Sequence, residues 1–268
     1  MIKLILTDMD GTLLNDHDEI NEEFWTIERQ LSNEGVVFAI ASGRPYYNLV
    51  RKFDRIKDNL LFICENGSLV MYKNREIFSN PMSQEQIDKV LLVSKEIKNI
   101  VPIFCGKSSS YIDKKIFDNS GTEMQTEIRK YYTTLALVEN IKDIPEEIIK
   151  VAICDFGISE ENSYNYFKEY SDIFNVVVSG KVWLDLSNPG TNKGVAVKKT
   201  QESLGISYDE TMAFGDYLND SEMMKNAKYS YAMKNAHPEL IAISNFITRD
   251  DNNNHGVTNT IKEVFNIK

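Results

Sequence analysis

Two carboxylates, Asp8 and Asp10, separated by a single residue, follow the first apolar segment of the chain. The run 2–7 ends directly before Asp8, and Asp10 and Gly11 come next. A buried strand that ends here presents both acids on a tight turn, because glycine turns without the steric cost of a Cβ. Asp8 is then placed to be a nucleophile and a metal ligand, and Asp10 to be a general acid and afterwards a base. The pattern indicates phosphoryl-transfer chemistry, with a solvated acidic turn as its alternative.

A small polar segment follows the second apolar run, 36–40. It consists of Ser42, Gly43 and Arg44. A hydroxyl and a backbone N–H at the end of a strand can hold phosphate oxygens without a net charge. An ordinary Ser-Gly turn is the alternative. Arg44 either adds a cation near the substrate or forms a salt bridge, and the sequence leaves both open.

Lys193 lies at the start of an expected helix over 194–204. A positive charge in the first turn opposes the helix dipole, so it contributes little to helix stability. A phosphate contact that also reduces the charge of the nucleophile explains Lys193 better, although an exposed lysine is the simple alternative.

Three oxygen-bearing side chains follow the apolar run 211–214. They are Asp216, Asn219 and Asp220, and such hard ligands suit Mg²⁺. Asn219 or Asp220 can also serve as a helix N-cap. If Asp216 and Asp220 converge with Asp8, the three carboxylates raise one another's pKa unless a cation lies among them. The acids themselves therefore predict a divalent metal.

The elements that must position these residues alternate between strand and helix. Apolar strands at 4–7, 36–40 and 60–64 are separated by helices at 22–33 and 46–53. Continuous apolar strands that alternate with helices predict a parallel sheet covered on both faces. We expect an α/β fold with a doubly wound, Rossmann-like core domain, whose ligands bind at the carboxyl ends of the strands.

The alternation of apolar strands and helices is interrupted in the middle of the chain and resumes after about residue 190. Between these points we expect helices at 83–99, 122–132 and 160–170 and strands at 101–104, 110–112, 148–156 and 182–186. This pattern predicts an inserted α+β cap domain over residues 82–188. The core domain then comprises residues 1–81 and 189–268.

Composition limits the classes of partner. The chain has 268 residues, and its net charge of −10 argues against general affinity for nucleic acid or anionic membranes. It contains no apolar run long enough to span a bilayer and no signal-peptide pattern, so we expect a cytoplasmic protein, with a monomer as the default state. The cysteines Cys64, Cys105 and Cys154 are widely spaced and predict neither disulfides nor a zinc site.

Four segments, in order along the chain, carry a family resemblance. They are Asp8-x-Asp10-Gly11-Thr12, Ser42-Gly43, Lys193 and Gly215-Asp216-x-x-Asn219-Asp220. They resemble the motifs of the haloacid dehalogenase-like superfamily of phosphatases, and more closely its Cof-type, sugar-phosphatase branch. Further segments resemble this branch: Arg44-Pro45, Glu65-Asn66-Gly67 and Met233-Lys234-Asn235-Ala236, in which Lys234 replaces a more usual glycine.

The resemblance implies the catalytic and metal-binding residues. Asp8 would form an aspartyl-phosphate, and Asp10 would be the acid and base, its backbone carbonyl also reaching Mg²⁺. Asp216 would ligate Mg²⁺ directly, and Asp220 would help to complete that end of the site. The metal set implied is therefore Asp8, Asp10, Asp216 and Asp220.

The resemblance also implies how substrate is held. The phosphate-binding set is Ser42, Gly43, Lys193 and Asn219, and the cap at 82–188 would close over the site and choose the substrate. The expected activity is Mg²⁺-dependent hydrolysis of a small phosphorylated metabolite, from sugar phosphates to pyridoxal phosphate or flavin mononucleotide.

Other classes of function compete with this interpretation. A nucleotide-binding domain is disfavoured because neither G-x-G-x-x-G nor a Walker-type motif occurs. A phosphomutase would use the same Asp8 and Asp10 but return the phosphate to its substrate. A catalytically silent ligand-binding protein on this fold is the third alternative.

Overall fold

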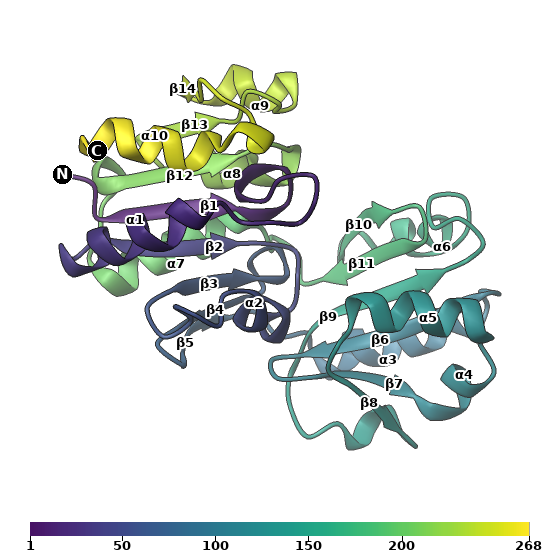
Figure 1. Ribbon diagram of the computed structural model, residues 1–268. Helices are drawn as coiled ribbons and strands as arrows, with labels where there is room; N and C mark the ends of the chain where they lie inside the picture. The colour runs from purple at the N-terminus through teal and green to yellow at the C-terminus, as the bar shows by residue number, and fades with distance from the viewer. Residues whose placement is uncertain (268) are drawn as a thin grey trace. The chain divides into compact units, whose positions relative to one another are not determined.

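The computed structural model describes residues 1–267, which form two compact units (Figure 1). The first unit comprises Met1–Arg44, Lys52–Phe78 and the chain from Asn192 onward, and the second comprises Pro45–Arg51 and Ser79–Thr191. The second unit thus interrupts the first, and it extends a few residues beyond 82–188 at both ends. The segment Pro45–Arg51, which the sequence places with the core, groups with the second unit. There the Tyr47 hydroxyl lies 2.9 Å from Ser110 Oγ.

The first unit is built on an eight-stranded sheet of order β14-β13-β12-β1-β2-β3-β4-β5. From β14 to β3 all neighbours are parallel, and β4 runs antiparallel to β3. The strands are β1 (Leu4–Asp8), β2 (Val37–Ala41), β3 (Leu61–Cys64), β4 (Leu69–Tyr72), β5 (Arg75–Ser79), β12 (Thr211–Gly215), β13 (Tyr229–Ala232) and β14 (Phe246–Ile247).

Helices cover both faces of this sheet. The helices α1 (Glu22–Asn33) and α10 (Gly256–Phe265) lie side by side on one face, and α7 (Lys193–Leu204) and α8 (Ser221–Met224) pack together on the other (Figure 1). The remaining helix of this unit is α9 (Pro238–Ile243), whereas α2 (Tyr46–Lys52) lies almost entirely in the segment that groups with the second unit. Every residue of β1 is buried, as a parallel strand covered on both faces requires. The predicted α/β fold with a doubly wound parallel sheet is confirmed.

The second unit has a six-stranded sheet of order β10-β11-β9-β6-β7-β8. Its strands are β6 (Ile100–Gly106), β7 (Ser110–Asp113), β8 (Leu135–Val138), β9 (Ile148–Asp155), β10 (Asn175–Gly180) and β11 (Trp183–Ser187). Its helices are α3 (Gln84–Ser94), α4 (Lys114–Asp118), α5 (Thr122–Tyr131) and α6 (Ser163–Phe167). One apolar core joins α3 and α6 to the sheet, and a second joins α4 and α5 to it.

Several elements of the second unit differ from the sequence prediction. The helix expected over 83–99 ends at Ser94, and the one expected over 160–170 is α6 followed by a short 3₁₀ turn. The strand β10 was not predicted, because its three valines are consecutive, with no alternation of apolar and polar residues, and half of its residues are exposed.

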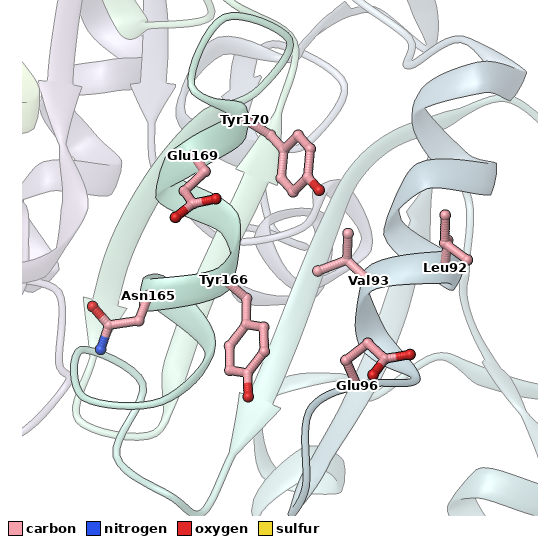
Figure 2. A pocket seen from close by; sticks show the side chains of 7 residues that line it. All are labelled: Leu92, Val93, Glu96, Asn165, Tyr166, Glu169 and Tyr170. Atoms are coloured by element: carbon pink, nitrogen blue, oxygen red, sulfur yellow. The ribbon is translucent and has the colours of Figure 1, made fainter.

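A hollow of about 580 Å³ lies between α3 and the segment of α6 (Figure 2). Its lining consists of Leu92, Val93, Glu96, Asn165, Tyr166, Glu169 and Tyr170. It lies within the second unit and contains none of the predicted site residues. Among the described residues, no helix combines the length and apolar character needed to cross a bilayer.

Candidate active site

The carboxyl end of β1 positions the first acid pair. Asp8 is the last residue of β1 and is buried, and a turn over Met9–Leu13 follows it. The chain turns at Gly11, whose φ is +79°, a conformation that favours glycine. A Cβ on Gly11 would also collide with the carboxylate of Asp216. Gly11 therefore allows the β1 turn and the Asp216 side chain to approach closely.

The start of α7 brings a lysine to Asp8. Lys193 is the first residue of α7, whose N-cap is the side chain of Asn192. The Lys193 ammonium donates to Asp8 Oδ1 at 2.5 Å and to Asp220 Oδ1 at 2.6 Å. The Lys193 side chain is completely buried. Lys193 is therefore the cation of an acidic cluster, and the alternative of an exposed lysine is wrong.

Asp220 organises the turn after β12. Its Oδ2 accepts hydrogen bonds from the backbone N–H groups of Asp216 (3.0 Å) and Tyr217 (3.3 Å), while its Oδ1 accepts from Lys193. A Cβ on Gly215 would lie 2.7 Å from Asp220 Cβ, so glycine at this position makes room for the fold-back of the Asp220 side chain. Asp220 thus fixes both Lys193 and the Asp216 turn.

Asp216 lies beside this pair and faces the β1 turn. Thr12 Oγ1 donates to Asp216 Oδ1 at 3.2 Å. Burial and the nearby Asp220 carboxylate raise the pKa of Asp216 to about 6. A carboxylate whose ionised form is disfavoured in this way is stabilised by any cation that binds beside it.

Electrostatic balance explains why these groups belong together. Burial and the Asp220 carboxylate raise the pKa of Asp8 well above its usual range, against the opposing effect of Lys193. Burial disfavours the Lys193 ammonium, but Asp220 and Asp8 outweigh it and raise the pKa of Lys193. With all groups ionised, the three carboxylates and one ammonium leave two negative charges in a buried site.

This donor set fits a divalent cation. One carboxylate oxygen from each of Asp8, Asp216 and Asp220 lies within 4.8 Å of the others. The ligand atoms are oxygens and the cluster has a net charge of −2, and both properties suit Mg²⁺. Asp220 already accepts three hydrogen bonds, so Asp8 and Asp216 are better placed for direct ligation.

The predicted phosphate-binding residues Ser42 and Gly43 lie at the end of β2. Ser42 is buried; its amide donates to Ile63 O (2.9 Å) and its Oγ accepts from the Arg44 amide (3.1 Å). Within the described part of the chain, the Gly43 amide has no hydrogen-bond partner. Of the two amides, the Gly43 N–H is therefore the one available to an anion.

Asn66 connects this loop to the β12 side of the site. A Cβ on Gly43 would lie 3.0 Å from Asn66 Nδ2, and Asn219 Nδ2 donates to Asn66 Oδ1 at 3.4 Å. The structure thus brings Gly43 and Asn219 to the same side chain. The sequence signal for Asn66 was only its place in the Glu65-Asn66-Gly67 segment.

Asp10 lies apart from the acidic cluster. Its side chain is 56% exposed, and both of its oxygens accept from the Arg44 guanidinium: Nε at 3.1 Å and Nη2 at 2.5 Å. Of the two roles left open for Arg44, this structure has the salt bridge. Asp10, the predicted acid and base, is therefore close to Asp8 in the sequence, but its carboxylate is paired with Arg44 outside the acidic cluster.

Two further residues support the β1 turn without having been assigned a role. Asn235 Nδ2 donates to Gly11 O at 2.9 Å, and Thr12 bonds Asp216 as described above. Both lie in segments that the family resemblance included. Their hydrogen-bond partners are distant in sequence, so spacing alone could not identify them.

Fold and site together define a class of protein. Buried acids at the carboxyl ends of two adjacent parallel strands, β1 and β12, share a buried lysine and fit a divalent metal. This arrangement suits metal-dependent chemistry by carboxylates on an α/β core. The family model described as haloacid dehalogenase-like hydrolase matches residues 5–261, and the chain belongs to that family. The predicted membership of the superfamily is confirmed.

Similar proteins span the full length of the chain. It is 33% identical over 271 residues to 5-amino-6-(5-phospho-D-ribitylamino)uracil phosphatase YbjI of Escherichia coli, covering 98% of this chain and 96% of the relative. It is 26% identical to the enzyme YcsE of Bacillus subtilis, which has the same activity name, covering 97% and 95%. The crystal structure of SMU.1108c from Streptococcus mutans aligns with a TM-score of 0.84 at 28% identity, covering 99% and 100%.

Proposed function

We propose that this phosphoric monoester hydrolase is a Mg²⁺-dependent phosphatase of small metabolites and that it acts through an aspartyl-phosphate on Asp8. The observation that carries the proposal is the buried cluster in which Lys193 bridges Asp8 and Asp220 beside Asp216. Monoester hydrolysis depends chiefly on in-line positioning and charge neutralisation. A carboxylate nucleophile held by a buried ammonium and a divalent cation supplies both.

Asp8 and Asp216 would hold Mg²⁺, with Asp220 beside them and the Asp10 backbone as a further oxygen donor. When bound, the metal supplies positive charge that balances the acids and the phosphoryl oxygens. Lys193 supplies the protein's own positive charge from inside the cluster.

In the first step a carboxylate oxygen of Asp8 attacks phosphorus. Asp8 Oδ1 is held by Lys193, so we assign the attack to Oδ2. The new bond joins Oδ2 to phosphorus, and the ester P–O bond breaks. The leaving oxygen takes a proton from Asp10, which has to be protonated and turned toward the site at this stage.

In the second step the ionised Asp10 takes a proton from water. The water oxygen attacks phosphorus, the bond to Asp8 breaks, and inorganic phosphate and free Asp8 are released. The Ser42 hydroxyl, the Gly43 amide, Lys193 and Asn219 would hold the phosphoryl oxygens during both steps. Fixed donors of this kind cost little reorganisation when the reaction occurs.

The substrate we propose first is a phosphorylated ribitylaminouracil. Two full-length relatives, YbjI and YcsE, carry that activity in their names. Hexose phosphates, pyridoxal phosphate and flavin mononucleotide complete the panel, because the cluster recognises a phosphate monoester and not the remainder of the molecule.

A phosphate-release assay over this panel, with and without EDTA, tests the proposal on wild type and Asp8→Asn. We expect EDTA to abolish release and Asp8→Asn to lower it by about a thousandfold or more, because the nucleophile is lost. Asp16→Asn is the matched control, since Asp16 bonds Asn252 and Asn253 outside the site.

Each contrary outcome identifies an alternative. Metal-independent release, or full activity of Asp8→Asn, would refute the mechanism. Transfer of phosphate to a second position of the substrate without free phosphate would indicate a phosphomutase. No turnover of any monoester, together with binding of one, would indicate a silent ligand-binding protein.

A further inference from the structure

Arg44 pairs with Asp10, the side chain to which the proposed mechanism assigns the acid and base role. It binds both oxygens of Asp10 as a bidentate pair, at 3.1 and 2.5 Å. A guanidinium fork paired in this way engages the atoms through which a carboxyl group donates and accepts protons. The Asp10 carboxyl group must separate from Arg44 before it can give a proton to the leaving oxygen or take one from the attacking water.

Arg44 has a second acidic partner in Asp18. Its Nη2 lies 3.2 Å from Asp18 Oδ1, so one guanidinium is shared by two carboxylates. Asp18 has a φ of +62°, a left-handed conformation that is uncommon outside glycine. This conformation is held by Lys52, whose ammonium donates at 2.5 Å to both the carbonyl oxygen and Oδ2 of Asp18.

The charges in this group compete with one another. Burial works against the Asp18 carboxylate, but Lys52 and then Arg44 outweigh it and lower the pKa of Asp18. Lys52 thus neutralises part of the negative charge of Asp18. The remaining negative charge determines how strongly Asp18 attracts Arg44. The chain Lys52, Asp18, Arg44, Asp10 lies wholly within the first unit.

We propose that Asp18 is a positioning residue that draws Arg44 away from Asp10, and that Lys52 sets how strongly it does so. The inference rests on the proposed function, because it assigns Asp10 the acid and base role. Exchange of Arg44 from Asp10 to Asp18 frees the Asp10 carboxyl to turn toward Asp8. Return of Arg44 to Asp10 restores the resting pair seen in the structure.

Substitutions at the two ends of this chain have opposite expected effects. Asp18→Asn leaves Asp10 as the carboxylate partner of Arg44, so kcat falls by about two- to fivefold, the size of an exposed ion-pair free energy. Lys52→Met leaves Arg44 as the cation facing Asp18, so kcat rises by a similar factor. Lys52→Arg keeps the charge and is expected to match wild type.

Kinetics on two leaving groups separate positioning from a structural defect. An alkyl phosphate needs the acid in the first step, whereas 4-nitrophenyl phosphate has a leaving group that needs no proton. Asp18→Asn is therefore expected to lose more kcat on the alkyl substrate. On 4-nitrophenyl phosphate it is expected to show a larger burst of nitrophenolate before slower turnover, because the Asp10 base acts only in the second step. KM is expected to be unchanged on the alkyl substrate and to fall together with kcat on 4-nitrophenyl phosphate, where the phosphorylated enzyme accumulates.

The control and the contrary outcomes are distinct from those of the proposed function. Asp16→Asn, in the same loop, is expected to equal wild type. Loss of kcat in both Asp18→Asn and Lys52→Met, equal loss on both leaving groups, or a rise in KM alone would overturn the inference. Absence of Mg²⁺-dependent hydrolysis by the wild type would instead refute the proposed function.

Discussion

At the scale of single residues, the charge of Lys193 decides how the acidic cluster behaves. Its ammonium contacts Asp8 and Asp220 and is completely buried. Removing one partner of a buried ion pair is costly, because the remaining charge loses its compensation in a medium of low polarity. The same ammonium offsets one of the three negative charges that attract a metal.

Lys193→Met is therefore expected to have three effects. The free energy of unfolding of the metal-free protein falls by about 3–5 kcal/mol, and phosphatase activity falls by about a hundredfold or more. The stabilisation produced by Mg²⁺ becomes larger than in wild type, because the cluster has one more negative charge. Denaturant unfolding with and without Mg²⁺, together with phosphate release, measures all three.

Lys199→Met is the matched control on the same helix. Lys199 forms an exposed pair with Glu202, and such pairs contribute about 0–1 kcal/mol. Equal stability of the two variants would contradict the role assigned to Lys193.

At the scale of elements, α1 carries an acid on its buried face. Glu28 is fully buried, and Ser32 Oγ donates to its Oε1 at 2.7 Å while its Oε2 has no hydrogen-bond partner among the described residues. Burial raises the pKa of Glu28. A folded-state pKa above the unfolded value means that stability is lost as the pH rises through the folded pKa.

Glu28→Met is expected to stabilise the protein by about 1 kcal/mol at alkaline pH, because it removes an incompletely satisfied buried carboxylate and conserves volume. The gain should disappear below a pH of about 4, where the carboxyl is protonated in both states. Thermal unfolding as a function of pH measures the difference.

Glu23→Gln on the same helix provides a control of opposite sign. The Glu23 carboxylate is paired with Lys262, and this hydrogen bond lowers the pKa of Glu23. The contribution of this pair to the free energy of unfolding is present above the unfolded-state pKa of Glu23. It is lost as the pH falls through the folded-state pKa. Stabilisation by both substitutions at alkaline pH would contradict the assignment.

At the scale of the whole molecule, all proposed metal ligands belong to the first unit. A ligand that binds only the folded state stabilises it by about 2.7 kcal/mol at one hundred times its dissociation constant. Adding Mg²⁺ to EDTA-treated protein is therefore expected to slow hydrogen exchange of amides in β1 and β12 by up to about a hundredfold. Amides of β6 and β9 in the second unit are expected to be unaffected.

Asp216→Asn removes one proposed ligand and should abolish this protection. Hydrogen exchange followed by mass spectrometry gives the comparison segment by segment. Equal protection of both units, or protection that persists in Asp216→Asn, would contradict a metal site confined to these residues.

The sequence was sufficient for the parts of the fold that depend on local pattern. Continuous apolar runs such as 36–40 and 60–64 predicted parallel strands, because a strand covered on both faces needs apolar residues at every position. Short edge strands such as β14 and β10 were not predicted, since they have only two and six residues, many of them exposed, and such segments carry little periodicity. The chain also contained the acids, the lysine and their order, which was enough to identify the superfamily.

Only the tertiary structure decided which of these groups meet. Asp8 and Asp10 are two residues apart, yet one is paired with Lys193 and the other with Arg44. Asp220 was predicted as a metal ligand, and its oxygens accept hydrogen bonds from Lys193 and from the turn after β12. Sequence determines residue type and local conformation, whereas the partners of a charge depend on side-chain directions and on contacts between distant segments.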